Sequence, residues 1–456
     1  MMRELLKKLD NEFKVEKIKY NGIHLWPFLR PYVIDAILIK EGDQSSETTK
    51  IDFKVFFLLV KSFFYGLPNL FKNHTYLVFS MAERRKKING VYHDRVAQGI
   101  SELFPEETLF IENPLYDGHY SIKELPTQRI MSQSPLLILS YLIGRGIFRI
   151  HKIAGLNVYK ELLMAYGIEL DIKVLTARFL GQYYFTKFLL KFYKPKKVFF
   201  VNLQNLLGCV KAFKERGILV YELQHGIINH EHPSYNYFID FNQEFSPDIL
   251  TTFSEREKKL FKGENFFLNE EQAIPLGYYF LSLYKNKEPG AALTKIRQIN
   301  KKILVYSSQD IYDHVIIPFL CKVALLDKSL TILIKLRHRN LTDLMTNLPV
   351  NMKVMSDYSI YELLTIADVH CTVSSTCAIE APFFNLPNVL INYQNYAHDY
   401  YGEMIRRNVS YVETPAELLV AFNKFHASKN ALEDHEVFFN DHYMENLKRL
   451  LDGTNK

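Results

Sequence analysis

Cysteine is scarce in this chain and shows no pairing pattern. The 456 residues include four cysteines, and none of them belongs to a CxxC pair or has a histidine at zinc-binding spacing. The four are Cys209, Cys321, Cys371 and Cys377. This pattern argues against a disulfide framework and a structural zinc site, so we expect four reduced and mostly buried thiols.

Apolar runs of membrane-spanning length are also missing. The run 55–71 is broken by a lysine, a glycine and a proline, and the run 136–143 stops at Gly144. Both are shorter than the roughly 20 apolar residues that a spanning helix needs, so we expect core helices, with an interfacial role left open for the second. The first 13 residues lack the apolar core of a signal peptide. We therefore expect a cytoplasmic protein whose membrane contact is peripheral and at the inner face.

A large excess of one charge is absent as well. Lysine and arginine total 56 against 50 acidic residues, which leaves a net charge of +6 spread over a long chain. This is not the concentrated basic stripe of a nucleic-acid-binding protein, and we expect no nucleic-acid partner. The mild excess favours an anionic ligand. No repeat of 20 to 50 residues is visible, which excludes solenoids and propellers.

Short apolar runs that alternate with helical stretches predict the fold class. The expected strands are 76–80, 108–111, 197–201, 218–223 and 249–253, followed by 303–307, 331–335, 353–355, 369–372 and 388–391. Continuous apolar strands separated by helices indicate parallel α/β sheets that are covered on both faces. The rhythm occurs twice, so we expect two Rossmann-like domains that face each other across a cleft.

A linker near 255–300, which contains a stretch rich in lysine, glycine and proline over 285–290, separates the two predicted domains. We expect an N-terminal domain over 1–255, a C-terminal domain over 256–430, and a charged helix within 431–456 that packs back on the N-terminal domain.

A serine- and threonine-rich turn follows the strand 369–372. Ser374, Ser375 and Thr376 open a predicted helix over 376–384, where hydroxyls and free N–H groups favour phosphate binding. Glu380 lies one helical turn further on, where its carboxylate could accept hydrogen bonds from ribose hydroxyls. An ordinary helix cap with an incidental glutamate explains the same spacing.

Two more loops are expected at the same sheet edge. Lys335, Arg337, His338 and Arg339 follow the strand 331–335, and such a cationic cluster can stabilise the charge of a phosphate leaving group. A solvated basic loop is the simpler alternative. Small hydroxyl residues, Ser307 and Ser308, follow the strand 303–307 and would allow phosphate or acceptor to approach closely.

No metal motif accompanies these loops. Asp310 and Asp313 are spaced differently from a DxD motif, and we found no other convincing set of metal ligands. We therefore expect catalysis without a metal or other cofactor.

The order of a Ser/Thr turn, a glutamate one turn later, and then Leu-Pro before an apolar strand resembles the donor-binding domain of GT-B glycosyltransferases. The similarity covers about 300–395 and is nearest to bacterial capsule, lipopolysaccharide and teichoic-acid transferases. His338 matches the histidine of their His-Pro motif, but Arg339 replaces the proline. The resemblance implies a nucleotide-sugar donor bound by the C-terminal domain and an acceptor bound by the N-terminal domain.

Three histidines follow the predicted strand 218–223. His225 precedes Gly226, which lets the backbone turn sharply, and His230 and His232 come shortly after. Related transferases have a His-Gly at this place, which implies a catalytic or acceptor-positioning role. A neutral imidazole can take the proton of an acceptor hydroxyl, so we predict that His225 is the general base and that His230 and His232 contact the acceptor. A structural histidine is the alternative.

Charged residues also follow the first strong strand, 76–80. Arg84 and Arg85 are predicted to hold an anionic, lipid-linked or acidic glycan acceptor, and Asp94 is a reserve candidate for the base. A solvated loop explains these charges equally well. The only tryptophan, Trp26, lies in the segment 22–30, for which we expect helix packing and no chemistry.

These observations favour a glycosyltransferase that moves a sugar from a nucleotide donor to a bacterial surface-polysaccharide or lipopolysaccharide acceptor. The donor base (CMP-, CDP-, UDP- or GDP-linked) is not resolved. Transfer of a polyol phosphate from a CDP-linked donor, epimerisation of a nucleotide sugar, and a non-catalytic scaffold that binds glycan or membrane stay open as alternatives.

Overall fold

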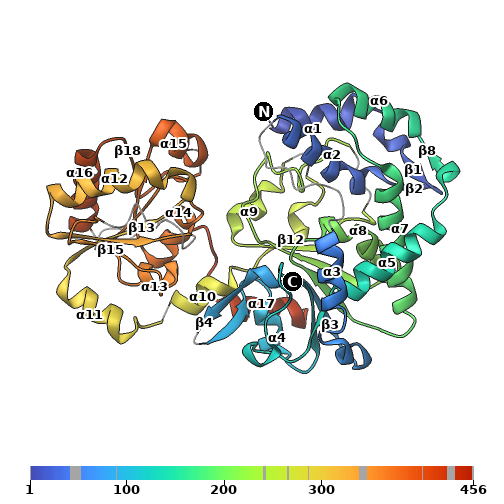
Figure 1. Cartoon of the computed structure of the whole chain (residues 1–456), viewed down its shortest axis with the longest axis horizontal. Coiled ribbons are helices and arrows are strands. Elements are labelled where there is room, and N and C mark those ends of the chain that lie inside the picture. Colours follow the sequence, from blue (N-terminus) through green and yellow to red (C-terminus); the bar gives the residue numbers. More distant parts are fainter. Residues whose placement is uncertain are drawn as a thin grey trace. The chain divides into compact units, whose positions relative to one another are not determined.

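The computed structural model describes residues 2–41, 53–88, 90–239, 243–263, 266–285, 287–337, 347–402, 404–428 and 437–453. The chain divides into two compact units (Figure 1). Unit 1 contains residues 1–279 and 443–456, and unit 2 contains residues 280–442. The division after Tyr279 lies beyond the boundary at 255/256 that the sequence indicated, because the strand β12 (Ala273–Pro275) completes the sheet of unit 1.

Unit 1 is built on a seven-stranded sheet in the order β12-β11-β10-β9-β3-β6-β7, whose paired strands are all parallel. Its strands are β3 (Tyr76–Met81), β6 (Thr108–Asn113), β7 (Ile130–Ser132), β9 (Lys197–Phe200), β10 (Leu219–Leu223), β11 (Ile249–Thr252) and β12. The chain moves outward in one direction from β3 to β7 and then returns to β9 on the other side of β3. The topological switch point of unit 1 therefore lies between β3 and β9.

Helices cover both faces of this sheet (Figure 1). One face packs on a core that includes residues of α1 (Met2–Asn11), α2 (Trp26–Glu41), α5 (Ser134–Ile147), α6 (Leu156–Tyr166), α7 (Ile172–Leu189) and α8 (Leu207–Glu215). The other face carries α4 (Gln98–Leu103) and the C-terminal helix α17 (Tyr443–Asp452). The unit also contains α3 (Phe53–Ser62), α9 (Glu255–Leu260), a small sheet of β1 (Lys19–Tyr20), β2 (Ile23–His24) and β8 (Ile153–Ala154), and the hairpin of β4 (Arg85–Ile88) and β5 (Val91–Asp94).

Two glycines explain how closely α5 and α7 pack. A Cβ atom on Gly144 would lie 1.9 Å from the carbonyl oxygen of Ala177, and one on Gly181 would lie 1.8 Å from that of Ser140. Because only hydrogen fits in these places, the two backbones can touch. The apolar run 136–143 is therefore part of a packed helix, as predicted.

The other apolar run differs from its prediction. It forms α3 and a 3₁₀ turn over Leu67–Phe71, and Phe57, Phe64 and Phe71 are 57%, 74% and 83% exposed. This segment is not a core helix. In the described residues, no helix has both the length and the apolar character needed to cross a bilayer.

Unit 2 has a six-stranded sheet in the order β15-β14-β13-β16-β17-β18, again with parallel pairs throughout. The strands are β13 (Lys302–Ser307), β14 (Leu330–Lys335), β15 (Met352–Val354), β16 (Val369–Thr372), β17 (Asn388–Ile391) and β18 (Val409–Val412). Its switch point lies between β13 and β16. This strand order is that of a Rossmann domain, so the predicted fold class of two Rossmann-like domains is confirmed.

Helices also cover both faces of the sheet of unit 2. Its helices are α10 (Tyr279–Lys285), which begins on the last residue of unit 1, and α11 (Ala291–Ile299), α12 (Asp310–Leu326), α13 (Ile360–Leu364), α14 (Cys377–Glu380), α15 (Tyr396–Tyr401) and α16 (Pro415–Ala427). In Figure 1, α12 and α16 lie on one face of the sheet and α13 lies on the other. Residues of α12 and α16 share a core with the strands.

Candidate functional site

Polar side chains gather at the carboxyl ends of the strands in each unit, where open α/β sheets bind their ligands. In unit 1 they follow β3 and β10, and in unit 2 they follow β13, β14 and β16.

His225 follows β10 and is only partly exposed. Burial, with a further contribution from the positive charge of Arg84, lowers the pKa of its imidazole to about 3. His225 is therefore neutral at physiological pH and free to accept a proton, although so low a pKa makes it a weaker base than one that titrates near pH 7. The backbone of Leu223 acts on this pKa in the opposite direction, and the buried Nδ1 atom makes no well-formed hydrogen bond among the described residues.

The turn after His225 is held by Gln224. The Nε2 atom of Gln224 donates to the carbonyl oxygen of Gly226 at 2.9 Å, and its Oε1 atom accepts from the N–H of Phe253 at 2.5 Å. This side chain fixes the sharp turn that the His-Gly sequence predicted and ties it to the neighbouring strand β11.

Arg84 lies in the 3₁₀ turn directly after β3. Its pKa is lowered, chiefly by burial, although the nearby carboxylate of Asp94 acts in the opposite direction. Its Nε atom is buried without a hydrogen-bond partner in the part of the chain that the structure describes. A partly buried guanidinium with an unused donor is suited to an anionic ligand.

Glu222 adds a third buried polar group to this edge. Burial raises the pKa of its carboxyl to about 8, and its Oε1 atom accepts from the hydroxyl of Tyr235 at 3.5 Å. Its Oε2 atom has no partner within the described residues. Glu222 was not predicted as a site residue, although a charged residue inside an apolar strand is a signal that could have indicated it.

Asp94 is completely buried and has a structural role. It accepts hydrogen bonds from the hydroxyl of Ser80 at 2.5 Å and from the N–H groups of Val96 and Ala97 at 2.8 and 2.7 Å. These bonds fix the turn that leads into α4. The role of reserve base predicted for Asp94 is corrected accordingly, because the carboxylate is fully engaged and shielded from solvent.

Arg85 also differs from its prediction. It is 2% exposed, its Nε atom donates to Glu112 at 2.8 Å, and its Nη1 atom donates to the carbonyl oxygen of Tyr92 at 2.9 Å. The two charges lie in the core between β4 and β6. Arg85 is therefore not available to hold an acceptor, and of the two predicted arginines only Arg84 remains.

The two later histidines lie in different surroundings. His232 is half-buried, its pKa is lowered by burial, and its Nδ1 atom accepts from the N–H of Ser234 at 3.3 Å. The charge of His232 would contribute to the low pKa of His225, so the two rings are close enough to interact electrostatically. His230 is exposed, and its ring packs on that of Phe266.

In unit 2, the loops after β13 and β16 are joined across the switch point. The hydroxyl of Thr372 donates to the carbonyl oxygen of Ser307 at 2.9 Å. The Nε2 atom of Gln309 donates to Ser374 Oγ at 3.0 Å, and its Oε1 atom accepts from the N–H of Ser374 at 2.7 Å. Gln309 was not predicted as a site residue, yet it sets the distance between the two loops.

The hydroxyl of Ser307 points into the protein. Asn388 Nδ2 donates to the carbonyl oxygen of Ala378, so Asn388 Oδ1 must accept from His370 Nδ1, 2.7 Å away. Burial lowers the pKa of His370 to about 4, so this ring is neutral and its Nε2 atom can only accept. Ser307 Oγ, 2.5 Å from that atom, therefore donates inward.

Ser308 is engaged in the same way, since its hydroxyl donates to Asp313 Oδ2 at 2.6 Å. Neither Ser307 nor Ser308 has a hydroxyl hydrogen left for a phosphate oxygen. This corrects their predicted role as small residues that hold donor phosphate, although both do line the switch point.

Ser375 and Thr376 are the hydroxyl residues that stay available. Ser375 Oγ accepts from the N–H of Cys377 at 3.3 Å, which leaves its own hydrogen to donate, and Thr376 is exposed. The helix that follows is shorter than predicted, because α14 ends after four residues and continues as a 3₁₀ turn over Ala381–Phe384. One turn has little dipole, so the hydroxyls matter more here than the helix end.

Glu380 is 8% exposed, and its Oε1 atom accepts from the hydroxyl of Tyr361 at 3.1 Å. Lys335 at the end of β14 donates to the carbonyl oxygen of Ser356 at 3.0 Å, and Arg337 is exposed next to Ser308, whose Oγ atom accepts its N–H at 3.4 Å. His338 and Arg339 lie outside the described residues.

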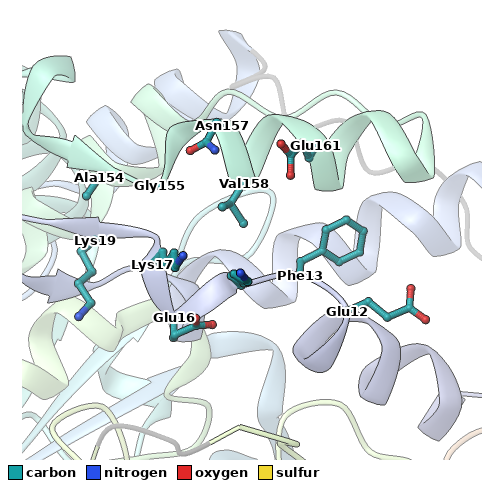
Figure 2. A pocket seen from close by; sticks show the side chains of 11 residues that line it. Glu12, Phe13, Glu16, Lys17, Lys19, Ala154, Gly155, Asn157, Val158 and Glu161 are labelled. Carbon is teal, nitrogen blue, oxygen red and sulfur yellow. The ribbon is translucent and has the colours of Figure 1, made fainter.

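The described residues contain no group of three or more His, Cys, Asp or Glu side chains arranged to hold a metal ion. An open hollow of about 910 Å³ on unit 1 lies away from these strand ends. Figure 2 shows Lys19 at one end of the hollow and Glu12 at the other, with Phe13 and Val158 between them. No predicted site residue lines it, and its charges are of both signs.

Comparison with known proteins establishes the fold. No family model matches the sequence, and neither does any curated protein. Among solved structures, UDP-GlcNAc 2-epimerase from Methanocaldococcus jannaschii matches with 12% identity and a TM-score of 0.50, over 83% of this chain and 99% of that one. At this identity the similarity shows that the chains share a two-domain α/β fold.

Two further structures are similar over most of the chain. A putative UDP-N-acetylglucosamine 2-epimerase from Listeria monocytogenes has 10% identity and a TM-score of 0.49, and the match covers 84% of this chain and 97% of that one. The wall teichoic acid polymerase TagF has 11% identity and a TM-score of 0.46, with 93% and 96% covered.

Proposed function

We propose that this chain is an enzyme that acts on a nucleotide sugar and transfers the sugar to a bacterial surface-polysaccharide or lipopolysaccharide acceptor. The observation that carries the proposal is the neutral, partly exposed imidazole of His225 at the end of β10, whose pKa is lowered by burial and lowered further by the partly exposed guanidinium of Arg84 after β3. Titratable groups whose pKa values are shifted by burial and by a neighbouring charge at the carboxyl ends of strands are typical of functional sites.

The proposed division of labour follows the two switch points. Unit 2 binds the nucleotide donor, with the hydroxyls of Ser375 and Thr376 on the phosphates and Glu380 on the ribose. Lys335, Arg337 and the predicted His338 stabilise the phosphate charge. Unit 1 binds the acceptor, for which Arg84 supplies a cation and His232 a second imidazole beside His225.

In the proposed reaction, His225 takes the proton from an acceptor hydroxyl as its oxygen attacks the anomeric carbon of the donor. The bond between that carbon and the phosphate oxygen breaks, and the nucleotide leaves with the electron pair. The low pKa of His225 keeps it unprotonated before the reaction. The cations of unit 2 offset the charge that grows on the leaving phosphate, and we propose that this step needs no metal ion.

A screen of nucleotide sugars tests the proposal. We expect one member of a set of UDP-, GDP-, CDP- and CMP-linked donors to raise the unfolding temperature, since a ligand that binds only the native state stabilises it. With that donor and a lipopolysaccharide or capsule acceptor, mass spectrometry should show an acceptor heavier by one sugar. Turnover should persist in EDTA; loss of turnover that Mg²⁺ restores would contradict a metal-independent step.

The same screen distinguishes the alternatives. An isomerised donor in the absence of acceptor would indicate an epimerase, the activity named for the M. jannaschii structure. An acceptor heavier by a polyol phosphate would indicate transfer from a CDP-linked donor. If no nucleotide binds, the scaffold alternative replaces the proposal.

A further inference from the structure

A buried ion pair joins the two N-terminal helices. Asp10 of α1 and Arg30 of α2 are 1% and 0% exposed, and their charges meet through two bonds. Arg30 Nε donates to Asp10 Oδ1 at 2.9 Å, and Arg30 Nη2 donates to Asp10 Oδ2 at 3.0 Å. Trp26, the only tryptophan of the chain, donates its indole N–H to Asp10 Oδ1 at 2.8 Å.

The remaining bonds of this pair reach a loop some 200 residues away. Arg30 Nη1 donates to the carbonyl oxygen of Pro233 at 2.6 Å, and Arg30 Nη2 donates to that of Asn236 at 2.8 Å. Asp10 Oδ2 also accepts from the N–H of Phe238 at 3.0 Å. The guanidinium lies over the ring of Tyr237, 4.2 Å from its centroid.

These contacts converge on residues 229–238, which we term the histidine loop because it carries His230 and His232. Inside the loop, the amide of Asn236 donates to the carbonyl oxygens of Asn229 and His232 at 3.0 and 2.9 Å. The loop also carries Tyr235, whose hydroxyl bonds to Glu222. It therefore sets the positions of His232 and Tyr235 beside His225 and Glu222.

Stability alone does not account for a pair of this kind. Desolvation of two charges offsets much of their attraction, so apolar side chains of similar volume often serve a core equally well. What an arginine adds is a planar set of donors that holds several oxygens at fixed angles. Here those oxygens belong to Asp10 and to two peptide groups of the histidine loop.

We infer that the Asp10–Arg30 pair is a positioning device that holds the histidine loop, and with it His232 and Tyr235, against the strand end that carries His225. Its effect on catalysis rests on the proposed function, whereas its effect on the loop does not. The segment 22–30 thus acts on the site through the loop, without touching a substrate.

The test compares Arg30→Lys with Phe28→Leu. Lysine keeps the charge, but one ammonium group cannot reach Asp10 and both carbonyls at once. Phe28 is a matched control because it is a fully buried residue of α2 whose ring packs on that of Phe179 and, being a hydrocarbon, can form no ordinary hydrogen bond to Asp10 or to the loop. Hydrogen exchange is measured on both full-length variants under native conditions.

We expect Arg30→Lys to speed exchange of the amides of residues 231–238 at least tenfold, with β9 and β10 unchanged. Phe28→Leu should not do so at an equal loss of unfolding temperature. Unchanged exchange in a folded Arg30→Lys variant, or equal acceleration in Phe28→Leu, would overturn the inference. If Arg30→Lys fails to fold, Asp10→Asn is measured with the same two outcomes, because it weakens the same contacts while keeping the shape of the side chain.

Kinetics separate this inference from the proposed function. Once a donor is known, Arg30→Lys should lower kcat about 10- to 100-fold and leave the Kd of the nucleotide within about twofold, because small displacements near a reacting group are costly. Faster loop exchange with an unchanged kcat would retain the loop contact but overturn the positioning role. Absence of any nucleotide-sugar activity would overturn the proposed function and leave the exchange result to decide the loop contact.

Discussion

At the scale of single residues, the chemistry of unit 1 depends on which polar side chains are fully engaged in hydrogen bonds or ion pairs inside the fold and which are not. Asp94 and Arg85 are equally polar in the sequence, but Asp94 accepts hydrogen bonds from backbone N–H groups and Arg85 is ion-paired with Glu112 in the core, whereas Arg84 and His225 stay partly exposed. Burial then decides their protonation, because the Arg84 charge and the low polarity of the site both disfavour a charged imidazole.

Removal of the Arg84 charge should therefore change how kcat/KM depends on pH. The pKa of His225 is about 3, and Arg84→Gln removes the second of its causes but not the burial. We expect the pKa to rise but to stay below the ordinary 6.5, so that the acidic limb of kcat/KM moves to higher pH. A pH profile of the variant measures this, with Lys86→Gln on the exposed side of β4 as control; an unmoved limb would contradict the proposed coupling.

A second residue-scale prediction separates two kinds of serine in unit 2. Ser375→Ala with Thr376→Ala should weaken nucleotide binding about 10- to 100-fold, through loss of two hydrogen bonds to phosphate. Ser307→Ala should leave nucleotide affinity within about twofold, because its hydroxyl donates to His370. It should instead lower the free energy of unfolding by about 1–3 kcal/mol, since His370 Nε2 is left unpaired.

Calorimetric titration of both variants decides the matter. If Ser307→Ala bound the nucleotide more weakly than the variant with Ser375→Ala and Thr376→Ala, the phosphates would contact the end of β13 and not the turn after β16. Equal affinities close to that of the wild type would reduce Ser375 and Thr376 to an ordinary turn.

Glu222 gives a prediction about stability. Its pKa is about 8 in the fold and 4.5 in the unfolded chain, so between these pH values the unfolded chain releases a proton that the native protein keeps. The native state therefore loses roughly 3 kcal/mol of stability as the pH rises from 4.5 to 7. Glu222→Gln cannot ionise and should be more stable than the wild type at pH 7.5 but not at pH 5.

Urea unfolding at the two pH values measures this difference. The exposed Glu169→Gln variant is the control. A stability difference between Glu222→Gln and the wild type that is the same at both pH values would show that the carboxyl does not remain protonated in the fold.

At the scale of elements, the central apolar strands of both sheets could be predicted closely, but of the four edge strands only β15 was predicted. The ten strands expected from the sequence all occur, with ends that differ by at most two residues, because buried parallel strands read as continuous apolar runs. The short strands β7, β12 and β18 were missed, since three or four residues at or near a sheet edge leave little pattern.

The candidate site was harder to predict for a different reason. Sequence places a residue at a strand end, but it does not show whether the fold supplies that residue with a partner. Asp94 and Arg84 lie ten residues apart at the same sheet edge. The carboxylate of Asp94 accepts hydrogen bonds from two backbone N–H groups, whereas the Nε atom of Arg84 has no hydrogen-bond partner among the described residues. The inward bonds of Ser307 and Ser308 depend on His370 and Asp313, which no local pattern reveals.

The C-terminal helix α17 gives an element-scale prediction. It belongs to unit 1, where Leu447 is fully buried and the hydroxyl of Tyr443 donates to the carbonyl oxygen of Val96 at 3.2 Å. Leu447→Ala should cost about 2–5 kcal/mol of stability, because it leaves a cavity between α17 and α4. The exposed Lys448→Ala should change stability by less than about 0.5 kcal/mol. Equal effects in thermal unfolding would mean that α17 does not pack on unit 1 in solution.

At the scale of the whole molecule, the chain consists of two Rossmann-like units with a polar cluster at the strand ends of each. The proposed function assigns the donor to unit 2 and the proton transfer to unit 1. Loss of His225 in unit 1 should therefore lower kcat and leave the Kd of the nucleotide donor unchanged, whereas loss of the Ser375 and Thr376 hydroxyls in unit 2 should raise that Kd. A single undivided site would not separate the two quantities in this way.

The rate of sugar transfer by His225→Ala, with donor and acceptor both saturating, tests this account most directly. We predict that kcat falls about 10²- to 10⁴-fold, as expected for loss of a general base, while the Kd of the nucleotide donor stays within about twofold. His151→Ala, at an exposed histidine of unit 1, should keep the wild-type rate. A near-wild-type kcat in His225→Ala, or a loss of donor affinity as large as the loss of rate, would contradict the account.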